Sequence, residues 1–270
     1  MKSSRKLAAG TKDGSLHTTG SAPALIRADS VCLEYPLHNT LLARFGRGRK
    51  SLTKRFQAIR DITLQLLPGE TLGIVGRNGS GKSTLSYVLA GVYQPDHGTV
   101  VRRGTVQLLT LGPGFHPDLT GRENVYVSAG LLGIGMSAAR ALVPDIQEFA
   151  ELGPFFDEPV RTYSSGMRGR LGFAVATAIE PDILIIDEIM ATGDRAFRDK
   201  AMQRMQNFRD SARGVVFISH NPGQVRSLCS RVIWLDKGEI VMAGEASEVL
   251  KEYTKFSKNP ATYFTSSGGG

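Results

Sequence analysis

The hydrophobic positions follow two patterns that divide the chain into segments. In residues 25–35 (LIRADSVCLEY) apolar and polar side chains alternate, and residues 57–70 (QAIRDITLQLLPGE) repeat the alternation before a Pro-Gly turn. Successive side chains of a β-strand point to opposite faces, so this alternation is typical of a half-exposed strand. We therefore expect two antiparallel strands in this part of the chain.

Other apolar segments are uninterrupted instead of alternating. Residues 70–75 (ETLGIV), 182–187 (DILIID) and 214–220 (GVVFISH) are each followed by a stretch that reads as a helix, the first of them ending near Ala90. A strand that is apolar on both faces is typical of a parallel sheet with helices on both sides. The pattern therefore predicts an α/β core. Two more short strands are expected, at 98–103 and 105–111.

The middle of the chain reads as a helical insertion at 112–165. Thr120 and Glu123 have the spacing of a capping box, which predicts that a helix begins there. A second helical stretch covers 137–152, and Pro144 either kinks this helix or delays its start because proline cannot donate a backbone hydrogen bond.

Length and composition fit one large globular domain or two small ones. The chain has 270 residues, 41% of them hydrophobic, and no apolar run approaches the roughly 18 to 20 residues that cross a bilayer. Residues 1–22 are polar and lack the apolar segment of a signal peptide, and 257–270 end in a Ser/Gly run, so we expect flexible tails around a domain at 23–256. The two cysteines, Cys32 in a predicted strand and Cys229 in a predicted helix, are compatible with a reducing, cytosolic compartment.

Positive charge is concentrated in one segment, 36–56. The formal net charge is +8, which suggests a polyanionic partner such as nucleic acid, anionic lipid or a phosphorylated substrate without choosing among them. Between Glu34 and Asp61 there is no acidic residue, whereas the basic residues there are Arg44, Arg47, Arg49, Lys50, Lys54, Arg55 and Arg60.

The segment GRNGSGKSTL, from Gly76 to Leu85, lies between a predicted strand and a predicted helix. It fits the P-loop pattern G-x-x-x-x-G-K-[ST], in which backbone N–H groups and the positive end of the helix surround a phosphate. Lys82 would reach the β- and γ-phosphates of a nucleotide and Ser83 would ligate Mg²⁺. The expected nucleotide-binding residues of this loop are Gly76, Asn78, Gly79, Ser80, Gly81, Lys82, Ser83 and Thr84.

Two adjacent carboxylates end the predicted strand at 182–187. Asp187 and Glu188 stand at the carboxyl end of this strand, which is where ligands bind in α/β sheets. We interpret Asp187 as a Mg²⁺ ligand and Glu188 as the group that polarises the attacking water.

Three further motifs separate this chain from other P-loop proteins. The segment YSSGM, beginning at Tyr163 just before a predicted helix, resembles the ABC ATPase signature LSGGQ, with Ser164 and Gly166 retained and Ser165 and Met167 as departures. ATGD, which ends at Asp194, resembles the D-loop of that family, and His220 matches its switch histidine. Together these motifs identify residues 24–256 as similar to an ABC transporter nucleotide-binding subunit.

The resemblance implies a P-loop NTPase (RecA-like) α/β core with an antiparallel β edge and an inserted α-helical subdomain. It also implies an ATPase that uses ATP and Mg²⁺ and works as a homodimer, with each ATP held by the P-loop of one subunit and by Ser164 and Gly166 of the other. A polytopic transmembrane permease would then be the partner, at the cytoplasmic face of the membrane. Tyr35 fits the family's adenine-stacking aromatic, although simple strand packing explains it equally well.

Several segments also resemble the polysaccharide-export branch of the family, whose members move lipid-linked glycans. These include LGPGFHPDLTGREN and DEIMATGD. Leu111 stands where the family has the Q-loop glutamine, which leaves open what replaces that side chain. The basic insert at 36–56 is either a solvated loop or, as we hypothesise, a segment that meets anionic headgroups or the pyrophosphate of the glycan carrier.

Two other classes compete with an exporter. A soluble ABC ATPase that acts on ribosomes or DNA would explain the basic charge, but such proteins usually carry two cassettes or a long coiled coil, and this sequence contains neither. A kinase or GTPase has no use for the signature motif or the switch histidine. The sequence therefore favours an exporter subunit with no nucleic-acid partner.

Overall fold

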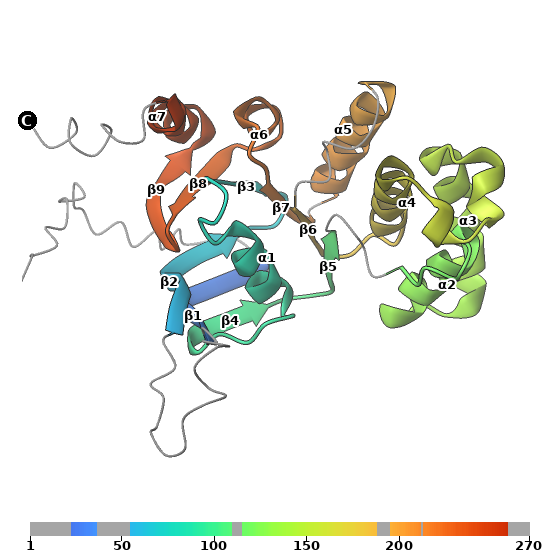
Figure 1. Ribbon diagram of the computed structural model, residues 1–270, viewed down its shortest axis with the longest axis horizontal. Helices are drawn as coiled ribbons and strands as arrows, with labels where there is room; N and C mark the ends of the chain where they lie inside the picture. The colour runs from blue at the N-terminus through green and yellow to red at the C-terminus, as the bar shows by residue number, and fades with distance from the viewer. Residues whose placement is uncertain (1–22, 37–54, 110–114, 188–194, 212, 259–270) are drawn as a thin grey trace, which may run out of the picture.

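The computed structural model describes residues 23–36, 55–109, 115–187, 195–211 and 213–258. Its strands form a six-stranded sheet with the order β5-β6-β7-β3-β8-β9 and a separate three-stranded sheet with the order β2-β1-β4 (Figure 1). The strands of the larger sheet are β3 (Thr71–Val75), β5 (Val106–Leu109), β6 (Ile183–Asp187), β7 (Gly214–Ile218), β8 (Arg231–Asp236) and β9 (Glu239–Glu245).

The larger sheet is parallel from β5 to β8, and β9 joins it antiparallel to β8. Every residue of β3, β6 and β7 is buried, which confirms the interpretation of these uninterrupted apolar runs. Alternate residues of β6 enter different cores: Leu184 and Ile186 pack on one face of the sheet, and Ile183 and Ile185 on the other. Helices must therefore cover both faces.

The predicted antiparallel strands form the smaller sheet, from β1 (Ile26–Pro36), β2 (Arg55–Leu66) and β4 (His97–Arg102). This sheet and helix α1 (Lys82–Ala90) share one core with the larger sheet. Helices on the opposite face contribute to the second core; they are α4 (Ser165–Ala178), α5 (Arg195–Asp210), α6 (Pro222–Leu228) and α7 (Ala246–Lys258).

The helical insertion contains α2 (Gly121–Leu131), α3 (Met136–Ala150) and two short 3₁₀ helices, at Gly153–Asp157 and Val160–Thr162. Figure 1 places α2 and α3 beyond the β5 end of the larger sheet, away from β1, β2 and β4. The capping box is confirmed, since the Thr120 hydroxyl accepts from the Glu123 amide and the Glu123 carboxylate accepts from the Thr120 amide.

Two local predictions are narrowed or corrected by the structure. Helix α3 begins at Met136 and contains Pro144, which excludes a delayed start and leaves the kink as the predicted effect of this proline. Cys229, expected within a helix, lies just after the last residue of α6. Pro36, Arg55 and Phe56 belong to strands, and the remainder of the basic insert lies outside the described residues. No helix in the described ranges is long and apolar enough to span a bilayer.

Candidate functional site

The P-loop lies between β3 and α1, as predicted. Gly76 is buried, and a Cβ there would lie 2.3 Å from the carbonyl oxygen of Leu235, so only glycine fits. Gly79 and Gly81 have φ values of 77° and 103°, which glycine adopts without the strain that other residues suffer. Gly81 is the N-cap of α1 and has no side chain to bond the first amides of the helix. These amides are therefore available to an anion.

The turn between β8 and β9 supports the P-loop from behind. The Gly238 amide donates to the carbonyl of Ser80 at 2.9 Å, and the Gly238 carbonyl accepts from the Arg60 amide at 2.8 Å. Gly238 thus ties the loop to β2 as well as to its own hairpin. The buried Ser80 hydroxyl has no hydrogen-bond partner within the described part of the chain. We expect such a group to find a partner when the loop is occupied.

A cavity of about 430 Å³ opens over the P-loop. Tyr35, near the end of β1, lines this cavity, so the structure places its aromatic side chain beside the P-loop. The Tyr35 hydroxyl lies 3.4 Å from the Thr84 hydroxyl, and the Tyr93 ring packs edge-on against Tyr35 with centroids 6.2 Å apart. The other lining residues are Phe56, Ala58, Asn78, Gly79, Gly81, Lys82, Ser83 and Thr84.

The side chain of Lys82 folds back over the loop. Its ammonium group donates to the carbonyl oxygens of Gly76 at 2.8 Å and Arg77 at 2.9 Å, and the residue is only 7% exposed. Burial of a charged group is costly unless it is hydrogen-bonded, and these carbonyls supply the bonds. The ammonium charge is therefore held at the loop itself, beside the cavity.

Asp187 ends β6 beside α1, and its carboxylate is buried. The hydroxyl of Ser86 lies 3.5 Å from the Asp187 carboxylate and 2.8 Å from the carbonyl oxygen of Ser83. Ser83 and Ser86 are one turn apart on the same face of α1. The structure thus brings the Asp187 carboxylate to the turn of α1 that carries the exposed Ser83.

His220 comes two residues after β7 and is exposed. Strand β7 lies between β6 and β3, with Ile218 paired to both Asp187 and Ile74. His220 therefore lies at the same edge of the sheet as the P-loop and Asp187, where the parallel strands end. The buried Ser219 holds the backbone that follows β7, because its hydroxyl accepts a hydrogen bond from the Asn221 amide at 3.1 Å.

The signature residues lie on a different element, at the start of α4. Ser164 is exposed and caps the helix by accepting from the Met167 amide at 3.2 Å. A Cβ on Gly166 would meet only the Ser164 hydroxyl, at 3.7 Å. Among the described residues that line the P-loop cavity, none comes from α4. Within one chain, then, Ser164 and Gly166 are not brought to the P-loop.

Tyr163, at the first position of the signature, has an internal role. Its hydroxyl donates to the carbonyl of Phe155 at 2.6 Å, and its ring is buried in the core that includes α4. Burial raises the pKa of Tyr163 to about 12. This residue anchors the start of α4 to the helical insertion.

Three predicted positions fall outside the described residues: Glu188, Asp194 and Leu111. Their expected roles remain predictions. Phe56, in contrast, lines the cavity but was not expected at the site. In the sequence, Phe56 is a large apolar residue at the edge of a basic segment, which could have drawn attention to it. The sequence does not give the strand register, however, and without the register the residue that pairs with Phe56 is unknown.

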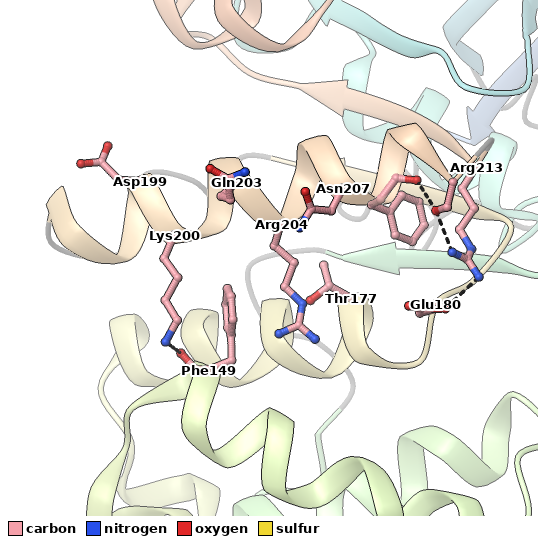
Figure 2. A pocket seen from close by; sticks show the side chains of 11 residues that line it. Phe149, Thr177, Glu180, Asp199, Lys200, Gln203, Arg204, Asn207 and Arg213 are labelled. Carbon is pink, nitrogen blue, oxygen red and sulfur yellow. Dashed lines mark hydrogen bonds and ion pairs between the residues drawn. The ribbon is translucent and has the colours of Figure 1, made fainter.

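A second, larger cavity of about 700 Å³ lies along α5, between this helix, α4 and the end of α3 (Figure 2). Its cationic side chains are already engaged: Lys200 donates to Glu151 at 2.8 Å, Arg204 pairs with Asp145, and Arg213 donates to Glu180 at 2.8 Å. Among the described residues that line it, none belongs to a helix N-terminus or to a glycine-rich loop. The smaller cavity has both, so it is the better candidate for the predicted nucleotide.

Comparison with known proteins agrees with this geometry. Residues 59–191 match the family model described as ABC transporter. The chain is 41% identical over 242 residues to the O-antigen export system ATP-binding protein RfbB of Klebsiella pneumoniae, covering 85% of this chain and 97% of that protein. It is 44% identical over 203 residues to the teichoic acids export ATP-binding protein TagH of Listeria innocua, covering 75% of this chain and 61% of that one.

Among solved structures, a dimeric ATP-binding cassette, MJ0796, in a post-hydrolysis state bound to ADP and Pi, matches with a TM-score of 0.70. The match covers 82% of this chain and 98% of the cassette, at 21% sequence identity. It establishes the fold shared by the two proteins.

Proposed function

The chain belongs to the ABC transporter family as an ATP-binding and ATP-hydrolysing subunit, and we propose that it powers export of a lipid-linked polysaccharide across the cytoplasmic membrane. The observation that carries the proposal is the 41% identity over 97% of an O-antigen export ATP-binding protein. Relatives named for teichoic acid export support the same class of cargo. The ribosome or nucleic-acid alternative has no such support.

In this proposal the P-loop and its flanking groups hold Mg-ATP. The loop amides and the start of α1 bind the phosphates, and Lys82 turns from the loop carbonyls to the β- and γ-phosphates. A hydroxyl and a carboxylate are hard oxygen donors that suit Mg²⁺, so Ser83 and Asp187 are the residues that would hold the ion. Bound there, Mg²⁺ would neutralise phosphate charge. Glu188 polarises the attacking water, and His220 contacts the γ-phosphate.

Two copies of the chain complete each site. Because Ser164 and Gly166 lie away from the P-loop of their own chain, the proposal has the start of α4 in one subunit, together with Asp194, meet the ATP bound by the other. The positive end of α4 then faces the γ-phosphate. Closure on ATP drives the membrane subunit, and hydrolysis releases the pair.

The partner in this proposal is a polytopic transmembrane permease, and the chain is membrane-associated through it at the cytoplasmic face. Anionic headgroups or the pyrophosphate of the glycan carrier would meet the basic insert at 36–56, whose arginines and lysines supply charge-assisted hydrogen bonds. Contact with the glycan itself is indirect.

Reconstitution tests the proposal. The chain and a co-purified polytopic membrane protein are placed in vesicles that contain a labelled lipid-linked glycan, and movement of the label between leaflets is followed. We expect ATP-dependent transfer that is lost in Glu188→Gln. Joint neutralisation of Arg44, Arg47, Arg49 and Lys50 should lower transfer but leave ATP hydrolysis by the isolated chain unchanged. Co-purification of rRNA or DNA, with no membrane protein, would contradict export.

A further inference from the structure

Phe56 occupies an unusual position for a large apolar side chain. Phe56 is the second residue of β2 and lines the P-loop cavity, and 50% of its surface is exposed. Ala58, two residues further along the same strand, lines the cavity as well. The register of β2 against β1 shifts at Ala58, between the pairs Gln57–Glu34 and Ile59–Leu33, and both Phe56 and Ala58 line the cavity beside the loop.

Phe56 is paired directly with Tyr35 across the antiparallel strands β2 and β1. Directly opposed residues have their Cβ atoms about 4.5 to 5.5 Å apart. Both side chains of this cross-strand pair line the P-loop cavity, so they present apolar surface to the same space.

The two rings differ in how firmly they are held. Tyr35 is only partly exposed and is braced by Tyr93 and by the hydroxyl of Thr84. Phe56 has half of its surface exposed and extends the same apolar surface outward. A ligand that reaches from the P-loop to Tyr35 would cover apolar area on Phe56, and aromatic rings contribute strongly when such area is buried.

We propose that Phe56 is a second base-contacting residue of the nucleotide site, which extends the surface offered by Tyr35 to a purine base. The inference rests on the proposed placement of the nucleotide in this cavity. An apolar ring does not read hydrogen-bonding groups, so Phe56 adds affinity for adenine and guanine alike. It does not contribute to phosphate binding.

The test measures affinities of the full chain by calorimetry with Mg²⁺ and three probes: ADP, GDP and pyrophosphate. These are not hydrolysed to smaller products by the ATPase reaction. In Phe56→Ala we expect the Kd for ADP and for GDP to rise about tenfold, since stacking on an aromatic is worth a factor of this order. The Kd for pyrophosphate stays unchanged, and Phe56→Tyr retains the wild-type values.

Val101→Ala is the matched control, because Val101 is 48% exposed on β4 of the same sheet but does not line the cavity. It should leave all three affinities unchanged. Unchanged ADP affinity in Phe56→Ala, or an equal loss for pyrophosphate, would overturn the inference. If the wild-type chain bound none of the probes, the nucleotide site itself would be misassigned, which is a separate and distinguishable failure.

Discussion

At this site, close packing restricts which residue can occupy a position as much as the need to bind phosphate does. Gly76 is held against the Leu235 carbonyl, and the ammonium of Lys82 is bonded to the loop that it serves. The motif spacing alone identified both residues, because a P-loop has few ways to bind a phosphate. Phe56 could not be found in this way, since its place opposite Tyr35 depends on strand register.

At the residue scale, Tyr163→Phe tests the anchor of the signature helix. The substitution removes the hydrogen bond from the Tyr163 hydroxyl to the Phe155 carbonyl, which then accepts only from the Glu158 amide, at 2.9 Å, among the described residues. We expect the free energy of unfolding to fall by about 1 kcal/mol at neutral pH, as measured by chemical denaturation. An unchanged unfolding free energy would show that this contact is not structural.

The same substitution should also change how the free energy of unfolding depends on pH. Because the folded-state pKa of Tyr163 is raised to about 12 from its ordinary value of 10.0, the folded chain holds this proton more tightly than the unfolded chain. Its contribution to stability is fully present below pH 10.0 and is lost as the pH rises toward 12. Tyr163→Phe should therefore show a smaller loss of stability over this range than the wild type.

At the element scale, the hairpin of β8 and β9 acts as a support for the P-loop. Gly238, with φ of 81°, sits where a Cβ would lie 2.6 Å from the Ala58 carbonyl oxygen. The apolar runs and the capping box predicted most strands and helices, because burial and end-capping are local signals. The contact between this turn and Ser80 joins distant segments and leaves no local pattern.

Gly238→Ala tests this support against a matched control, Gly133→Ala. Both glycines have positive φ, with values of 81° and 77°, so both substitutions carry similar backbone strain. A Cβ on Gly133 meets nothing within 4 Å, whereas one on Gly238 displaces β2 from the turn. We expect the affinity for ADP to fall in Gly238→Ala and to stay unchanged in Gly133→Ala; equal effects in both would contradict the support.

At the scale of the whole molecule, the residues predicted to bind ATP form two groups that lie on separate elements of the chain. The P-loop, Asp187 and His220 gather at one edge of the larger sheet, while Ser164 and Gly166 begin α4 outside the P-loop cavity. The strand and helix patterns alone do not indicate this division, whereas the family resemblance does, because it implies that another subunit completes the site. The proposed site therefore requires that ATP brings two chains together.

Gly166→Glu separates dimer formation from ATP binding. A Cβ at Gly166 would meet nothing closer than 3.7 Å among the described residues, and Gly166 does not line the P-loop cavity, so we expect the variant to fold and to bind ATP normally. Its carboxylate would stand where the proposal places the γ-phosphate of the partner's ATP, and like charges repel. Glu188→Gln, which removes the proposed water-polarising carboxylate, is the background in which a closed dimer should persist.

The most direct measurement is the mass of Glu188→Gln by light scattering, in Mg-ATP and in Mg-ADP. We expect a dimer in Mg-ATP, a monomer in Mg-ADP, and a monomer in both when Gly166→Glu is added, with ATP binding by the P-loop retained. A chain that binds ATP but stays monomeric with Glu188 replaced would contradict the account.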